Sequence, residues 1–273
     1  MDYILYELRD RVAVITLNRP ERRNAQNKQL LIELDQAWDR AKNDKDAKVI
    51  VLKANGPHFS AGHDIARDAT YDSKVNEFVG DLKTKGLYDL YCWEGHYYLG
   101  FCRKWRDVPK PSIAAVQGAC IAGGLMLAWP CDLIVAAENA KFSDPVVRMG
   151  IGGVEYHGHT WEFGARKAKE MLFTGGAIDA QEAHRLGMVN RVVPLEQLED
   201  ATMALANQIA EMHPFALAMA KRAVNQTLDI MGQYAAQQAA FDTHEMGHAS
   251  ALAQSGEPVL VDLNNLKAAN KKA

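Results

Sequence analysis

Hydrophobic and polar positions alternate over the first seventeen residues of the chain. Ile4, Tyr6 and Leu8 share one side of the first segment. In residues 12–17, one set of alternate positions faces away from the other, and the polar stretch Arg9-Asp10-Arg11 lies between the two segments. A period of two is typical of a β-strand with unlike faces, and a short polar break between two such runs is typical of a turn. The pattern predicts a pair of strands.

Further along, the hydrophobic period changes repeatedly between helix and strand. Residues 27–43 carry apolar side chains at helical spacing, and continuous apolar runs follow at 49–52, 112–116 and 133–136, with a glycine-containing turn and an apolar helix after 118–124. Short apolar runs between helices are typical of buried parallel strands. We therefore expect an α/β fold whose helices cover a mostly parallel sheet.

The last third of the chain is predominantly helical in pattern. Two short helices are predicted between about 166 and 187, a late strand within MVNRVVP, and helix from 195 onward, including a long segment at 214–247. Residues 66–105 form an excursion between two core strands. The alanine-rich helical tail is predicted to pack against the body or against a neighbouring subunit.

Composition and charge narrow the classes of partner. The 273 residues include 31 basic and 34 acidic side chains, so the net charge of −3 offers no excess positive charge for nucleic acid or an anionic membrane. No stretch approaches the roughly 18 apolar residues of a membrane span, and the N-terminal residues lack a secretory pattern. We expect a cytoplasmic protein. The four cysteines form no CxxC pair and are predicted to be structural thiols.

A five-residue motif near the end of the chain raises the question of a metal. His244-Glu245-Met246-Gly247-His248 has the spacing with which two histidines on a helix share zinc. The motif lacks an evident third ligand, because Ala251 and Gln254 stand where one class of zinc peptidase continues with Gly and His, and Glu257 is only nine residues on. An exposed helix end without metal is the favoured interpretation.

Two glycine-bearing turns follow predicted strands, at residues 58–65 and 121–124. A helix N-terminus presents unsatisfied N–H groups and the positive end of the helix dipole, so it can stabilise an oxyanion through backbone alone. Phosphate binding or a plain structural turn are alternatives, although the lysine of a P-loop and the GxGxxG pattern are both absent.

Four segments carry a resemblance to a known family. They are VAVITLNRPERRNAQN, VIVLKANGPHFSAGHDI, KPSIAAVQGACIAGGLMLAWPCDLIVAAENAKF and FTGGAIDAQEAHRLGMVNRVVP. Through them the chain resembles the crotonase, or enoyl-CoA hydratase/isomerase, superfamily over nearly its full length. The resemblance implies a spiral core of β-β-α repeats over residues 1–195 that holds the acyl-CoA site, and a C-terminal helical oligomerisation region over 196–273 in a homotrimer or homohexamer.

The resemblance also implies roles for individual residues. Backbone N–H groups of His63 and Gly123 are expected to form an oxyanion hole for the thioester enolate, which leaves the His63 side chain free to vary. Arg22 is a candidate for the CoA phosphates, although a solvated basic turn is an equal alternative. Substrate contacts are expected from four further residues: Ala61, Asp64, Met126 and Val146. No cofactor is expected beyond the coenzyme A of the substrate, and no metal.

The sequence departs from the hydratase pattern at the two acid/base positions. Met126 and Val146 stand where hydratases of the family carry glutamates, and neither side chain can transfer a proton. Some relatives in the family carry their working carboxylate about three to five residues after the glycine that Gly150 matches, so the resemblance makes Glu155, five residues on, the lead replacement. His157 could orient Glu155 or act as the base itself. Asp144 is a third catalytic candidate, for which a turn hydrogen bond is the favoured role.

Other ionisable side chains are weaker candidates. They are Arg148, His159 and Glu162 near Glu155, and Asp68, Glu94 and His96 in the excursion. Three functions remain open: a hydratase or isomerase with relocated acid/base groups, an acyl-CoA hydrolase or carbon–carbon cleaving enzyme that uses Glu155, and an acyl-CoA-binding protein without turnover.

Overall fold

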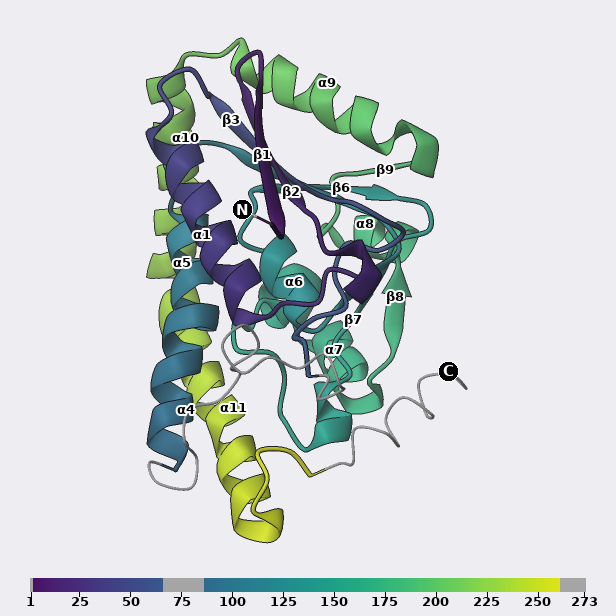
Figure 1. The fold of residues 1–273 in the computed structure, drawn as a ribbon, viewed down its shortest axis with the longest axis vertical. Coiled ribbons are helices and arrows are strands. Elements are labelled where there is room, and N and C mark those ends of the chain that lie inside the picture. The colour runs from purple at the N-terminus through teal and green to yellow at the C-terminus, as the bar shows by residue number, and fades with distance from the viewer. Residues whose placement is uncertain (1, 66–85, 261–273) are drawn as a thin grey trace.

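A six-stranded sheet forms the centre of the molecule (Figure 1). The computed structural model describes residues 2–65 and 86–260. The strand order is β1-β2-β3-β4-β6-β9, in which β1 pairs antiparallel with β2 and all other neighbours are parallel. The strands span Ile4–Arg9, Val12–Leu17, Val49–Ala54, Ser112–Val116, Leu133–Ala137 and Arg191–Val193. The predicted strand pair and the buried parallel strands are confirmed.

Helices bury both faces of this sheet, which explains why every residue of β2 is buried and why all of them except Thr16 are apolar. Val12 and Val14 face a layer built by α9 (Leu198–Ala210), whereas Ile15 and Leu17 face the larger core. That larger core includes side chains of α1 (Lys28–Asn43), α5 (Phe101–Arg106) and α6 (Gly123–Ala128). The helix α9 therefore shares the core of the main sheet, although it lies C-terminal to residue 195.

A second sheet of three short strands lies beside the first and completes the spiral. Its strands are β5 (Ala119–Ile121), β7 (Lys141–Ser143) and β8 (Ala177–Asp179), in that order. The chain passes from β4 to β5 and then to α6, and from β6 to β7 and then towards α7 (His159–Thr174). Each of these two turns thus contributes one strand to each sheet before a helix, and the predicted β-β-α spiral is confirmed.

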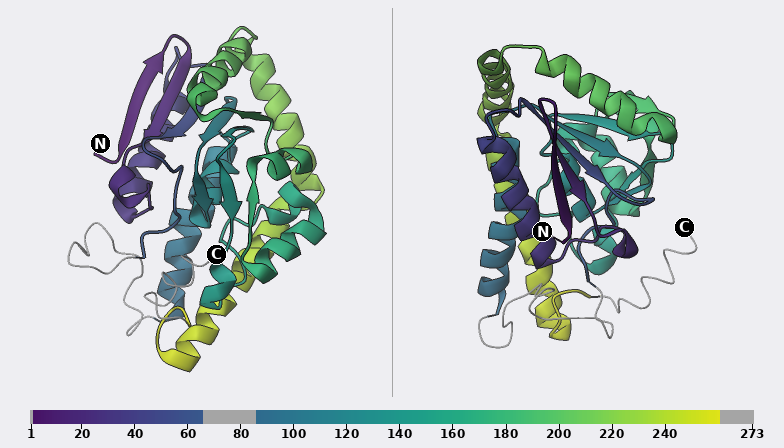
Figure 2. Two further views of the ribbon diagram at one scale, coloured as in Figure 1. Left: turned by 90° about the vertical axis from the view of Figure 1, so that its right-hand side faces the viewer. Right: turned by 45° about the horizontal axis from the view of Figure 1, so that its top comes forward.

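The described part of the excursion is a helix interrupted by a π-helical turn. The helix α4 (Leu87–Glu94) leads through η2 (Gly95–Gly100) into α5 without leaving the helical region of backbone space. Figure 2 shows this helix beside the C-terminal helices, and α11 (Gln233–Ser255) contacts α4. Segments that are about 150 residues apart in sequence are thereby brought together.

Two predicted helical boundaries were wrong. The segment 214–247 is two helices, α10 (Pro214–Ile230) and α11, because Gly232 adopts a φ of +100° that a helix interior does not allow. The first helix predicted near 166 begins at His159 instead, and α8 (Ala180–Leu186) follows it. No described helix has the length and apolarity needed to cross a membrane.

Candidate functional site

Two loops meet at the carboxyl ends of β3 and β4. The Ser60 N–H donates to the Ala119 carbonyl, 3.1 Å between N and O, and the Ile121 N–H donates to the Ser60 carbonyl at 3.0 Å. Gln26 secures the first loop from its other side, because its N–H donates to Gly62 and its carbonyl accepts from Asp64, both at 2.8 Å. The two glycine-bearing turns singled out in the sequence therefore form one backbone-pinned unit.

The second loop enters α6 through a strained residue. Ala122 precedes the helix with a φ of +49°, a region that residues with a side chain seldom occupy, and its N–H donates to the Ser143 carbonyl at 2.8 Å. This conformation turns the chain sharply from β5 into α6. Gly123 then begins the helix, where its N–H has no intrahelical acceptor.

The His63 side chain fills the space over Gly123. A Cβ built on Gly123 would lie 2.4 Å from His63 Cδ2, so only glycine fits there without displacing the imidazole. The imidazole also stacks on Tyr98 of η2, with 3.8 Å between the ring centroids. Burial lowers the pKa of His63 to about 3, so the ring is neutral at ordinary pH. The expected freedom of this side chain to vary stays a prediction, but the ring is tightly enclosed.

Glu155 lies next to this unit. Its Oε1 atom is 3.7 Å from His63 Nδ1 and 3.6 Å from His244 Nε2, and its side chain is 4% exposed. Burial raises the pKa of Glu155 to about 8, although the charge of His244 opposes this. Within residues 2–65 and 86–260, the buried Oε2 atom has no hydrogen-bond partner. A carboxyl group that titrates near neutral pH is suited to proton transfer.

His63 and His244 lie beside Glu155, whereas His157 was the histidine predicted there. The rings of His157 and His159 are tilted relative to each other, with 4.5 Å between their centroids. Burial lowers the pKa of His157 to about 4. The role of His157 as the orienting partner of Glu155 or as the base therefore stays a prediction.

The Asp144 carboxylate accepts hydrogen bonds from the backbone of the segment that follows it. Its carboxylate accepts hydrogen bonds from the N–H of Val146 at 3.4 Å and of Val154 at 2.9 Å, and its Oδ2 lies 3.0 Å from His159 Nε2. Both Asp144 and His159 are fully buried. Asp144 thus holds the turn and the start of the segment that carries Glu155, and its candidacy as a catalytic group stays a prediction.

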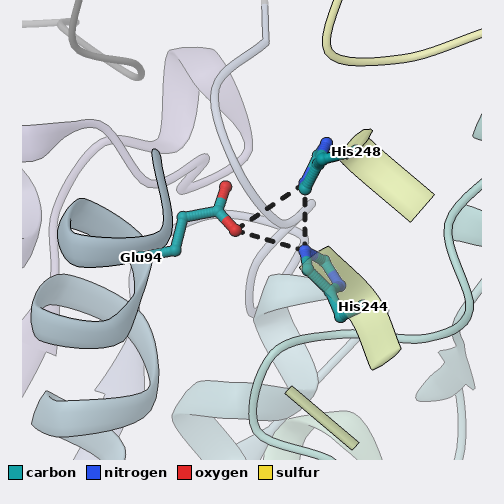
Figure 3. A group of neighbouring side chains, drawn as sticks. All are labelled: Glu94, His244 and His248. Carbon is teal, nitrogen blue, oxygen red and sulfur yellow. Dashed lines mark hydrogen bonds and ion pairs between the residues drawn. The ribbon is translucent and has the colours of Figure 1, made fainter. Parts of the chain in front are cut away.

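The expected exposed helix end is wrong, because His244 and His248 are both 5% exposed. They extend from α11 towards Glu94 at the end of α4, as Figure 3 shows. Three distances define the cluster: His244 Nε2 to Glu94 Oε2, 3.2 Å; His248 Nε2 to Glu94 Oε2, 3.7 Å; and His244 Nε2 to His248 Nε2, 3.0 Å. Burial lowers the pKa of His244, but the charges of Glu155 and Glu94 outweigh this effect and raise the pKa to about 10.

The other predicted site residues have the following contacts and exposure. Asp64 forms a buried ion pair with Arg19 at 2.6 Å, and Ala61 donates its N–H to the Arg23 carbonyl. Arg22 lies half-buried in the short helix η1 (Pro20–Arg22). Met126 belongs to the main hydrophobic core and Val146 packs against that core. Both positions are therefore apolar in their surroundings as well as in their side chains. Among the weaker candidates, His96 is exposed and Asp68 lies outside the described residues.

A comparison with known proteins defines the class to which this fold and site belong. Residues 7–256 match the family model of enoyl-CoA hydratase/isomerase, and the chain belongs to that family.

Solved structures from mycobacteria are similar to the chain. A probable enoyl-CoA hydratase from Mycobacterium smegmatis is 59% identical, with a TM-score of 0.88 over 96% of this chain and 100% of that one. A probable enoyl-CoA hydratase from Mycobacterium thermoresistibile is 60% identical, with a TM-score of 0.87 over 94% of this chain and 99% of that one. The Mycobacterium tuberculosis protein EchA13 is 44% identical over 91% of this chain and 81% of the relative.

Proposed function

We propose that the protein acts on an acyl-CoA thioester through an enolate held by the backbone N–H groups of His63 and Gly123. The membership in the enoyl-CoA hydratase/isomerase family supports the substrate class. The backbone pinning of the two loops supports the site, because donors fixed before the reaction stabilise developing charge without reorganisation. The strained Ala122 adds to this, since strain of this kind is concentrated at functional positions.

Glu155 is the proposed proton-transfer group. The observation that carries this assignment is its position: a buried carboxyl group, 92 residues away in sequence, lies 3.7 Å from the imidazole of His63. Met126 and Val146 leave the usual acid/base positions apolar, so proton transfer needs a group from elsewhere. His63 and His244 contact Glu155 from two sides and orient it.

The proposed step is proton transfer at the carbon next to the thioester carbonyl. In isomerisation, ionised Glu155 accepts a proton from that carbon as the C–H electron pair forms the enolate, and the enolate takes the same proton back at the γ-carbon, so the double bond moves. In hydration, ionised Glu155 accepts a proton from a water whose oxygen bonds to the β-carbon while the double-bond electrons move onto the thioester oxygen, and the enolate then takes that proton at the carbon next to the carbonyl. Either sequence returns Glu155 to its ionised form.

Glu155→Gln is the direct test, because it removes the acid and keeps the shape. Turnover of crotonyl-CoA, a long-chain enoyl-CoA and a cyclic β-oxo acyl-CoA is followed by absorbance and by mass, since hydration adds one water and isomerisation adds none. We expect kcat to fall by about 100-fold or more, with CoA binding unchanged. Glu170→Gln is the matched control, since Glu170 is exposed on α7 and pairs with Lys167.

The outcomes separate the proposed role from its rivals. Unchanged turnover in Glu155→Gln removes this residue from the mechanism. Cleavage of the cyclic compound alone supports a hydrolase that uses Glu155. An inactive parent protein that binds CoA tightly supports a binding protein without turnover.

A homotrimer or homohexamer is the proposed assembly. The helix α10 has no buried residue in the isolated chain, and its apolar side chains Phe215, Val224 and Ile230 are more than half exposed. An apolar helix face of this kind is usually covered by a partner. Light scattering coupled to size-exclusion chromatography gives the number of subunits, and a monomer would contradict the assignment.

A further inference from the structure

We propose that Glu94, His244 and His248 bind one divalent transition-metal ion of the Zn²⁺ type. These residues gather three ligand atoms, one from each side chain, within 4.8 Å of one another in a buried position. Figure 3 shows the carboxylate from α4 and the two imidazoles from α11 converging on one point. Two histidines and one glutamate, with a fourth position left for water, are a ligand set that zinc adopts in catalytic sites.

The distances between the ligand atoms match a common metal. Zinc lies about 2.0–2.1 Å from imidazole nitrogen and carboxylate oxygen, so two ligands at a tetrahedral angle are about 3.3 Å apart. The three separations in this cluster are 3.0, 3.2 and 3.7 Å, which bracket that value. An ion therefore fits with side-chain shifts of only a few tenths of an ångström.

Hydrogen bonding fixes which nitrogen of each ring faces the cluster. His244 Nδ1 lies 2.6 Å from the Gly153 carbonyl, and His248 Nδ1 lies 2.6 Å from the Pro258 carbonyl. A carbonyl oxygen can only accept, so both Nδ1 atoms carry the hydrogen. When both rings are neutral, as metal ligands are, their Nε2 lone pairs point at each other across 3.0 Å, and this repulsion is relieved either by a cation between them or by a proton on His244.

This arrangement is the one that metal-binding histidines use. A backbone carbonyl that accepts from one ring nitrogen fixes the tautomer, orients the ring and makes the other nitrogen a better ligand. Both rings have such a carbonyl, and the two carbonyls come from separate loops. Without metal, His248 Nε2 and the Glu94 carboxylate oxygen share the single proton that His244 Nε2 can donate. A metal ion contacts all three.

Glu155 links this cluster to the proposed catalytic site. Its Oε1 atom is 3.6 Å from His244 Nε2, so a water on the fourth position of the ion would be within reach of its carboxyl group. Metal binding does not require the proposed function, because Glu94 and His248 have no role in the proton transfer, and His244, which orients Glu155, can bind an ion whether or not Glu155 reacts. Metal uptake and turnover are measured separately, so failure of one proposal is distinguishable from failure of the other.

Metal uptake by the full-length protein tests the inference. Purified protein is stripped with a chelator, dialysed and titrated with Zn²⁺ or Co²⁺ alone, and bound metal is measured by elemental analysis. We expect about one equivalent per chain. Bound Co²⁺ should show the intense visible absorption of a four- or five-coordinate ion rather than the weak absorption of the hydrated ion.

Three variants make the test specific. Glu94→Gln and His248→Asn each remove one ligand, and each should weaken the affinity for Zn²⁺ by about 100-fold or more and abolish the Co²⁺ spectrum. His184→Asn is the matched control, since its Nδ1 also meets a backbone carbonyl, Val189, at 2.8 Å. That variant should bind metal as the parent protein does. Circular dichroism establishes whether each variant is folded. If His248→Asn is not folded, the isosteric Glu94→Gln carries the test alone.

Two results would overturn the proposal. One is uptake of less than about a tenth of an equivalent by the stripped parent protein at micromolar Zn²⁺. The other is uptake that Glu94→Gln and His248→Asn leave unchanged. Either would mean that the cluster is an internal ion pair in which a protonated His244 bonds to Glu94.

Discussion

Gly124→Ala is the change that most directly tests whether the two loops act as a unit. A Cβ on Gly124 would lie 2.6 Å from the Ser60 carbonyl oxygen and 3.3 Å from the carbonyl carbon. Restoring an ordinary contact of 3.4 Å requires the loops to separate by about 0.8 Å. The obstructing atoms belong to the backbone, and the Ser60 carbonyl already accepts from Ile121, so no side-chain rotation relieves the clash.

The expected magnitude follows from two opposing terms. Overpacking of a well-packed region costs about 1–3 kcal/mol, whereas alanine in place of glycine within a helix gains up to about 1 kcal/mol. Because backbone atoms cannot move aside, the first term should win by about 1–2 kcal/mol. For a domain of this size the melting temperature should then fall by about 2–8 °C.

The same displacement should reduce turnover. Ser60 is three residues before His63, so a shift of about 0.8 Å changes the spacing of the two proposed oxyanion donors. Misplacement on the order of 1 Å can cost about 100-fold in rate. We expect kcat/KM to fall by about 10-fold to 100-fold on whichever thioester the parent protein converts.

Thermal denaturation and steady-state kinetics measure the two effects. Gly152→Ala is the control, because a Cβ there meets nothing within 4 Å and its φ is not positive. That variant should match the parent protein in both assays. If Gly124→Ala keeps the parent melting temperature within about 1 °C and the parent kcat/KM, the reasoning about the pinned loops is refuted.

Two further predictions concern ion pairs. Asp64→Asn removes the charge opposite the buried Arg19 and should lower the free energy of unfolding by about 3 kcal/mol in chemical denaturation, whereas loss of an exposed pair costs less than about 1 kcal/mol. Hydrogen bonds with Lys53 and then Arg9 lower the pKa of Glu199, so its carboxylate stabilises the fold above pH 4.5 and loses that effect as pH falls through the lowered value. The cost of Glu199→Gln, less than about 1 kcal/mol at pH 7, should therefore disappear in denaturation at acid pH.

Each of these two predictions has a result that contradicts it. Glu211→Gln removes the exposed partner of Arg11 and is the reference for Asp64→Asn. Equal losses from Glu211→Gln and Asp64→Asn would mean that burial does not strengthen the Arg19 pair. A cost of Glu199→Gln that stays constant from pH 7 to acid pH would mean that charge is not its cause.

The elements with strong local signals were predictable from sequence. Alternation at 4–17, apolar runs at 49–52 and 112–116, and helical spacing at 27–43 each report burial that the neighbouring residues impose, so strands and helices appear where predicted. The break at Gly232 was missed because glycine is tolerated within helices, and only its φ of +100° reveals the interruption. Local patterns therefore gave the elements but not every boundary.

The site was only partly predictable, because its parts come from distant segments. The turns at 58–65 and 121–124 were found through their glycines, and Glu155 through its distance from Gly150. The spacing of His244 and His248 was noticed, but Glu94 lies 150 residues before His244 and no sequence period relates them. His157 was a candidate because the ordinary pKa of an imidazole lies near working pH, but the chemistry of a side chain does not give its direction in a loop, and His63 and His244 are the side chains found beside Glu155.

The position of α11 changes how the C-terminal region should be understood. Residues 196–273 were expected to form an oligomerisation region, and that assignment stays a prediction. Yet α11 places the His244 imidazole 3.6 Å from Glu155, while the usual acid/base positions on α6 and after β7 are apolar. The charged groups around the site therefore come from α4, from α11 and from the loop before α7. It follows that a chain shortened before α11 would lose part of the environment of Glu155 even if it kept the backbone unit of His63 and Gly123.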